Sequence, residues 1–175
     1  MPRLVRRLTA VFALVATACW PVPLTAQDPP GTRNREEFSL ELRTVDGTRM
    51  TLDALRGKVV VLDFWATWCA PCLVELPRLR RLHDELGNTS LVIVGISLDT
   101  IEPRRLASWT RRNEIAWPQV HDGRGYNGAL ARQFGVEDLP ATVLFDRDGR
   151  LAARDLRGDR LEAAIRALLA GVGRD

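Results

Sequence analysis

The chain has 175 residues, 46% of them hydrophobic and 27% charged, which is enough for one domain with a sizeable buried core. Its formal charge of +3 resides in the first 26 residues, which hold three arginines and no acids, so the rest of the chain is neutral (3 − 3 = 0). No basic stripe interleaved with aromatic residues is present, and we therefore expect no nucleic-acid partner.

Residues 1–26 have the pattern of a signal peptide or membrane anchor. Three arginines precede an apolar run, Leu8–Trp20, that is short for a membrane span, and a small-residue end suits cleavage after Ala26. Two alternatives remain: Cys19 as the acylated cysteine of a lipoprotein, or an uncleaved anchor. Each predicts an exported, extracytoplasmic protein, in the periplasm or on the outer face of the membrane.

Residues 27–37 contain no apolar residue apart from proline and glycine, so we expect a flexible linker to a domain spanning 38–175. That domain opens with Phe38–Val45, where apolar and polar residues alternate. Asp46-Gly47 predicts a turn, and the chain returns through Thr48–Leu52. The segment is therefore expected to be a β-hairpin.

A buried strand followed directly by a Cys-x-x-Cys pair is the central feature of the chain. Five residues of Val59–Phe64 are apolar, which predicts a buried central strand. The pair Cys69/Cys72 follows, and leucines every three residues predict a helix from Cys69 to about Leu86. A thiol at a helix N-terminus lies near unpaired backbone N–H groups and the positive end of the dipole, and both favour thiolate. The second thiol lies one turn on, on the same face, close enough to form a disulfide.

The remainder of the chain alternates between buried strands and amphipathic helices. The expected strands are Leu91–Ser97, Trp117–Val120, Val143–Asp146 and a last one ending near Asp155, and the expected helices are Asp99–Glu114, Gly125–Gly135 and Asp159–Leu169. A right-handed crossover makes the strand at 91 parallel to the strand at 59. The sequence thus predicts an α/β domain with a central mixed sheet flanked by helices on both faces.

The residues around the cysteine pair resemble the thioredoxin superfamily, and more narrowly the extracytoplasmic thiol-disulfide oxidoreductases of the TlpA/ResA type. The resemblance rests on Phe64-Trp65-Ala66-Thr67-Trp68-Cys69, Pro71-Cys72 and Glu75-Leu76-Pro77. It implies a thioredoxin fold with an N-terminal β-hairpin and an inserted helix–strand unit that ends at Val120. It also implies an enzyme, a thiol-disulfide oxidoreductase that reduces protein disulfides.

The resemblance assigns roles on both sides of the expected site. Cys69 would be the nucleophile and the more exposed thiol, and Cys72 the buried resolving thiol that releases substrate from a mixed disulfide. The substrate-binding residues would be Trp68, Pro71, Leu139 and Pro140. Pro140 matches the superfamily's cis-proline, which exposes a backbone edge to an extended substrate.

Two carboxylates are further candidates for catalysis. Asp63 lies on the buried strand, at the position of the buried acid of thioredoxin, and would take the proton of Cys72. Glu75 lies one turn after Cys72 and matches a glutamate of the TlpA/ResA group, where it would tune Cys69 or meet the substrate. The alternative for Glu75 is a solvated helix face.

Other functions of a cysteine pair require features that differ from this sequence. A zinc site needs a second ligand pair at finger-like spacing. A peroxiredoxin-like thiol peroxidase carries a threonine three residues before its nucleophile, where this chain has Ala66, with Thr67 one position later. A copper chaperone on this fold spaces its cysteines by three residues and adds a histidine near the later strands, and neither feature is present in this sequence. A non-catalytic assembly module is disfavoured by the intact cysteine pair.

We therefore expect no metal and no cofactor beyond a redox-active Cys69–Cys72 disulfide. The expected partners are protein thiol or disulfide substrates and an electron donor in the membrane or envelope, with the protein itself a monomer. Cytochrome c maturation and metal-site assembly are processes that proteins of the resembled type serve.

Overall fold

The computed structural model of the chain describes residues 40–87 and 89–171. The expected signal segment, Cys19 and the expected linker lie outside the described residues. Within the described ranges, no helix combines the length and the hydrophobicity that crossing a membrane requires.

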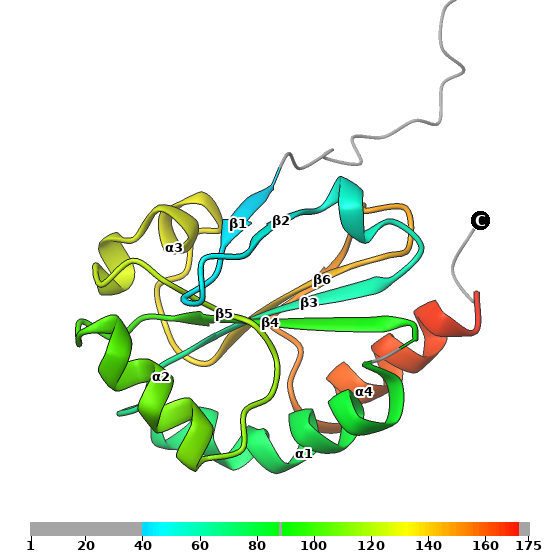
Figure 1. Cartoon of the computed structure of the whole chain (residues 1–175). Coiled ribbons are helices and arrows are strands. Elements are labelled where there is room, and N and C mark those ends of the chain that lie inside the picture. Colours follow the sequence, from blue (N-terminus) through cyan, green and yellow to red (C-terminus); the bar gives the residue numbers. More distant parts are fainter. Residues whose placement is uncertain (1–39, 88, 172–175) are drawn as a thin grey trace, which may run out of the picture. The chain divides into compact units, whose positions relative to one another are not determined.

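A five-stranded mixed sheet forms the centre of the domain (Figure 1). Its strands, in spatial order, are β5 (Gln119–His121), β4 (Leu91–Ser97), β3 (Val59–Trp65), β6 (Ala141–Phe145) and β7 (Leu151–Arg154). Strands β3, β4 and β5 run parallel, whereas β6 and β7 each run antiparallel to the preceding neighbour. Every residue of β3 is buried, which explains its continuous apolar run: it is a central strand covered on both faces.

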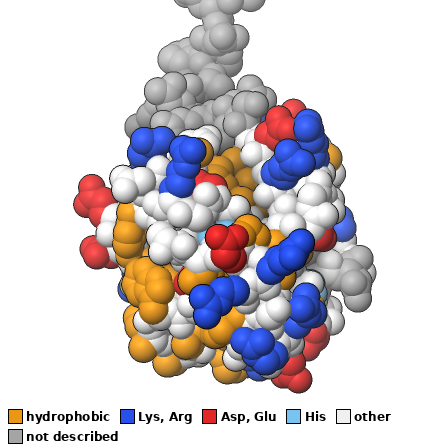
Figure 2. All heavy atoms as spheres, turned by 60° about the vertical axis from the view of Figure 1, so that its left-hand side comes forward, with side chains coloured by type: hydrophobic (Ala, Val, Ile, Leu, Met, Phe, Trp, Pro, Cys, Tyr) orange, Lys and Arg blue, Asp and Glu red, His pale blue; other side chains and the backbone are white. Residues whose placement is uncertain are grey.

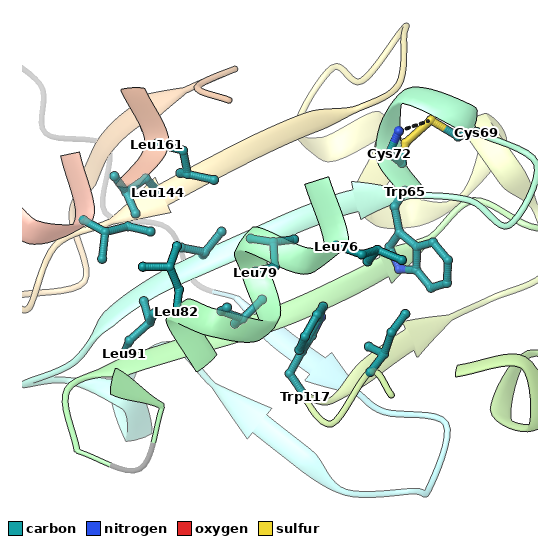
Figure 3. Packing of buried hydrophobic residues seen from close by; sticks show 14 of the residues in the cluster. Trp65, Cys69, Cys72, Leu76, Leu79, Leu82, Leu91, Trp117, Leu144 and Leu161 are labelled. Carbon is teal, nitrogen blue, oxygen red and sulfur yellow. Dashed lines mark hydrogen bonds between the residues drawn. A yellow bond between two sulfur atoms is a disulfide. The ribbon is translucent and has the colours of Figure 1, made fainter. Parts of the chain in front are cut away.

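Helices α1 (Ala70–Leu86), α2 (Pro103–Arg112) and α4 (Gly158–Leu169) lie below the sheet in Figure 1. The buried leucines of α1 are Leu76, Leu79 and Leu82. They pack in one cluster with alternate residues of β3, with Trp117, and with Leu161 of α4 (Figure 3). The leucine repeat in the sequence is therefore the buried face of α1.

The opposite face of the sheet is covered by the N-terminal hairpin, β1 (Glu41–Arg43) and β2 (Arg49–Thr51), together with α3 (Ala129–Gln133). Phe64 of β3 meets Phe134 edge to face there, with ring centroids 5.9 Å apart. A bridge from Thr44 to Val120 joins the hairpin to the edge strand β5. Short 3₁₀ turns, η1 (Asp53–Leu55) and η2 (Gly125–Asn127), complete the described elements.

Two expected helices are shorter than the sequence pattern predicts. Helix α2 begins at Pro103 rather than at Asp99, because the Asp99 side chain accepts hydrogen bonds from Thr67, in the loop before α1. The expected helix Gly125–Gly135 is divided into η2 and α3 at Gly128, which is extended. Asp122 accepts the backbone N–H of Ala129 at this break, which fixes the start of α3.

Candidate active site

The two cysteines form a disulfide at the start of α1. Cys69 is the N-cap of the helix, and its sulfur accepts a hydrogen bond from the backbone N–H of Cys72 at 3.2 Å (Figure 3). Pro71 lies in the first turn, where a backbone N–H has no partner within the helix. The cap places the first sulfur at the positive end of the helix dipole, which stabilises negative charge on it.

The expectation that Cys69 is the more exposed thiol is wrong for the disulfide form. Both cysteines have only 3% of their surface exposed, because the bond holds both sulfurs against the cluster of Trp65 and Leu76. The accessible groups around them are apolar: Trp68 is 60% exposed and Val74 is 76% exposed. Figure 2 shows the face at the left of Figure 1, where hydrophobic side chains gather at the lower left, with charged side chains of both signs above them and to their right.

The loop before β6 forms the other side of the site. The Leu139–Pro140 peptide bond is cis, which confirms the expected geometry. Antiparallel pairing sets Ala141 opposite Phe64, so Pro140 lies level with the end of β3. Pro140 is buried, whereas Leu139 is half-buried and touches both hydrophobic clusters. An arginine, Arg157, donates a hydrogen bond to the Pro140 carbonyl.

Asp63 is a buried carboxylate in the layer between the sheet and α1. It lies on the same face of β3 as Val61 and Trp65, which belong to the hydrophobic cluster that includes both cysteines. Burial, and secondarily the negative charge of Glu75, raises the pKa of Asp63 to about 7. Among the described residues, none donates a hydrogen bond to this carboxylate, so nothing offsets its desolvation. A group that binds and releases a proton near neutral pH therefore lies beneath the helix that carries Cys72.

Glu75 does not lie on a freely solvated helix face. It is half-buried between α1 and α4, and its Oε2 accepts the backbone N–H of Gly158 at 3.1 Å. Gly158 is the first residue of α4, so Glu75 satisfies an N–H that the helix itself leaves unpaired. The contact joins the helix of the cysteine pair to α4, and it keeps a negative charge near Asp63.

Asp99 is a site residue that the sequence analysis missed. It is fully buried, and it accepts hydrogen bonds from Thr67 N at 3.0 Å, Thr67 Oγ1 at 2.6 Å and Ser97 Oγ at 2.9 Å. These bonds tie the loop that leads to Trp68 and Cys69 to the end of β4. An acid two residues after the end of a buried strand was the available signal, but the helical pattern that follows it obscured that signal.

The same hydrogen bonds bear on the alternative functions. The Thr67 hydroxyl donates to Asp99, so it is engaged within the protein rather than directed at a peroxide. Within the described residues, no three side chains of histidine, cysteine, aspartate or glutamate are grouped so as to hold a metal ion. The arrangement is suited to exchange between thiols and disulfides.

Comparisons with known proteins agree with this geometry. Residues 34–154 match the AhpC/TSA family. A thiol-disulfide oxidoreductase ResA from Bacillus thuringiensis subsp. konkukian is 25% identical over 135 residues, which cover 77% of this chain and 75% of that protein. The solved structure of a thiol-disulfide oxidoreductase from Bacteroides fragilis NCTC 9343 is 28% identical, with a TM-score of 0.67 over 75% of this chain and 98% of the other.

A second solved structure, from Chlorobium tepidum, is assigned as a thiol:disulfide interchange protein DsbE. It is 25% identical, with a TM-score of 0.65 over 76% of this chain and 94% of the other. These likenesses confirm the expected thioredoxin-like fold and the expected class of enzyme.

Proposed function

The chain belongs to the AhpC/TSA family and is a thioredoxin-like thiol-disulfide oxidoreductase, and we propose that it reduces protein disulfides outside the cytoplasm. The observation that carries the proposal is the Cys69–Cys72 disulfide at the capped start of α1, next to the Leu139–Pro140 edge. This disulfide is the only redox group that the reaction needs, so no further cofactor takes part.

The reaction proceeds by two thiol–disulfide exchanges. The Cys69 thiolate attacks one sulfur of the substrate disulfide, which forms a mixed disulfide and releases the other substrate sulfur as a thiolate that takes up a proton. The Cys72 thiolate then attacks the Cys69 sulfur and releases the second substrate thiol. Two electrons pass to the substrate, and the enzyme is left as the disulfide described above. A reduced donor in the membrane or envelope restores the dithiol.

Asp63 takes the proton of Cys72 before the second exchange. Burial makes ionisation of the Cys72 thiol harder, so the resolving step needs a proton acceptor. A carboxylate whose pKa is raised to about 7 is half ionised at neutral pH and is suited to that transfer, directly or through one water. Glu75 supports the step from its place beside Asp63 by raising the affinity of Asp63 for the proton.

The substrate lies across the exposed ring of Trp68, the first helical turn at Pro71 and the backbone at Leu139 and Pro140. The exposed ring of Trp68 supports this arrangement, since tryptophan is enriched at surfaces that bind other polypeptides. An extended polypeptide that carries a disulfide fits such an edge better than a small peroxide does. Apocytochrome c and the cysteine pairs of metal sites under assembly are the substrate classes to test first.

The proposed location rests on residues 1–26, whose charged start, apolar run and small-residue end are typical of export signals. N-terminal mass analysis of the protein from the cell envelope separates the alternatives. Cleavage after Ala26 gives a chain that starts at Gln27, and lipidation gives an acylated Cys19 that Cys19→Ser abolishes. An intact Met1 identifies an anchor. Recovery of the protein in the cytoplasm would contradict export.

Trapping tests the proposed activity. In Cys72→Ala the second exchange cannot occur, so substrates remain linked to Cys69 and can be identified after release with dithiothreitol. Cys69→Ala is the matched control, because it retains one thiol in the same turn of the helix yet lacks the nucleophile. Equal adducts in the two variants would refute the assignment of Cys69. A reduction potential near −120 mV, which is typical of a strong oxidant, would refute the reductant role.

A further inference from the structure

We infer that Arg157 is a positioning residue, which holds the Leu139–Pro140 edge at a fixed place relative to the disulfide. The inference deepens the proposed function and rests on it, because the edge matters only if a polypeptide substrate binds there. The residue lies between β7 and α4, a segment to which the sequence analysis gave no role. It lies 88 and 85 residues after the two cysteines (157 − 69 and 157 − 72) and 17 residues after Pro140.

Four contacts fix the segment that carries Arg157. The N–H of Asp155 donates to the Thr142 carbonyl at 2.8 Å, and the hydroxyl of Thr142 donates to the Leu156 carbonyl at 2.7 Å. The N–H of Gly158 donates to Glu75 on α1 at 3.1 Å. The guanidinium of Arg157 donates to the carbonyl of Pro140.

These contacts reach both halves of the site from one short loop. Glu75 belongs to the helix that begins at the cysteine pair, and Pro140 belongs to the loop that faces the pair. Residues 155–158 therefore connect the two halves directly, in addition to the pairing of β3 with β6. The bond to Pro140 is the contact that reaches the loop itself, since two of the others end on Thr142 inside β6 and the third ends on Glu75 of α1.

The chemistry of the contact suits positioning. Arg157 is exposed and is the N-cap residue of α4, but its side chain makes no capping bond to that helix. Its side chain instead donates a charged hydrogen bond to the carbonyl of Pro140, just before β6 begins to pair with its neighbours. A charge-assisted hydrogen bond is stronger than a neutral one, and the guanidinium remains charged at any pH at which the protein is folded.

The inference predicts a selective loss on Arg157→Ala. With the Pro140 carbonyl released, the edge would sample other positions and a polypeptide substrate would bind more weakly. We expect KM for insulin reduction, with dithiothreitol as donor, to rise about tenfold, while kcat changes less than about twofold. Reduction of hydroxyethyl disulfide, which is too small to need the edge, should be unchanged.

Two variants serve as controls. Arg157→Lys keeps a cationic donor, so it should restore KM to within about threefold of the wild type. Arg160→Ala removes a charge one turn further along α4, from an exposed side chain that makes no hydrogen bond or ion pair with the described residues, and should leave both substrates unaffected. Hydrogen exchange of peptides covering residues 139–142 should be faster in Arg157→Ala only.

Several outcomes would overturn the positioning role of Arg157. Equal losses on insulin and hydroxyethyl disulfide, equal effects of Arg157→Ala and Arg160→Ala, or an unchanged KM would overturn the positioning role. A raised KM without faster exchange at residues 139–142 would overturn it too, because Arg157 would then contact the substrate directly. If the wild type reduces hydroxyethyl disulfide but neither insulin nor disulfide-bonded apocytochrome c, the proposed function itself is wrong, whatever the exchange data show.

Discussion

Replacement of Asp63 by asparagine should stabilise the protein at alkaline pH and leave its stability at acid pH nearly unchanged. Burial, and secondarily Glu75, raises the pKa of Asp63 from 3.8 to about 7 in the folded state. Between these two values the folded protein holds a proton that the unfolded chain has released. The free energy of unfolding therefore falls as pH rises from about 4 to about 7, and is constant above that.

The size of the effect follows from the shift. About three pH units at roughly 1.4 kcal/mol each amount to about 4 kcal/mol of stability that the wild type lacks above pH 7 and retains below pH 4. Asparagine has nearly the same shape and does not ionise, so it removes this pH-dependent loss. The protonated carboxyl and the amide are both neutral polar groups, so any difference in the cost of burying them changes the gain by the same amount at every pH.

Urea unfolding of the oxidised proteins at pH 4.5 and pH 8 measures the difference, since the disulfide keeps both thiols from titrating. The stability gain of Asp63→Asn at pH 8 should exceed its gain at pH 4.5 by about 3 kcal/mol. Asp138→Asn, at an exposed acid, is the matched control and should give no such difference. The same gain at both pH values would show that Asp63 ionises normally, and the proton-transfer role proposed for it would lose its support.

Three further predictions follow from contacts in the described part of the chain. Asp99→Ala leaves the N–H and the hydroxyl of Thr67 without their acceptor, so it should lower the free energy of unfolding by about 3 kcal/mol in urea titrations. The rate of disulfide reduction should fall as well. An unchanged urea midpoint would contradict the role of Asp99 in holding the loop before Cys69. Hydrogen bonds, first from Arg166, lower the pKa of Glu162, so Glu162→Gln should reduce the urea midpoint at pH 7. The effect of the substitution should shrink as the pH falls below 4.5, the ordinary pKa of a glutamate, because the wild type then takes up a proton and loses the stabilisation that the ionised carboxylate provides. Leu82→Ala, at a fully buried position, should cost about 2–5 kcal/mol while retaining activity in the folded fraction, which thermal unfolding and a parallel activity assay would check.

The parts of the structure that the sequence predicted are those that local patterns determine. The short, β-branched valine run of β3 favours a strand covered on both faces, and the leucine spacing of α1 corresponds to its buried stripe. The burial of Asp63 followed from its place within that apolar run. These features depend on residues close together in the sequence, so periodicity together with run length and local composition identifies them.

The parts that the sequence did not predict depend on contacts between distant residues. Glu75 finds its partner at Gly158, 83 positions away, and Asp99 finds Thr67 at a distance of 32 positions. Helical periodicity carries no information about partners so far away in the sequence. At Asp99 it predicted a helix that begins four residues before α2 does. The expected exposure of Cys69 was wrong for a related reason, because the disulfide and the surrounding cluster decide it rather than the position in the helix.

The shortness of the ring closed by the disulfide has a consequence for the catalytic cycle. Cys69 and Cys72 are three positions apart, so their bond restricts the unfolded chain far less than a bond between distant residues would. Oxidation and reduction should therefore alter the conformational entropy of the unfolded ensemble only slightly. Closing and opening this bond in every turnover therefore changes the freedom of the unfolded chain little, so the fold depends in both oxidation states on the hydrophobic cluster around α1.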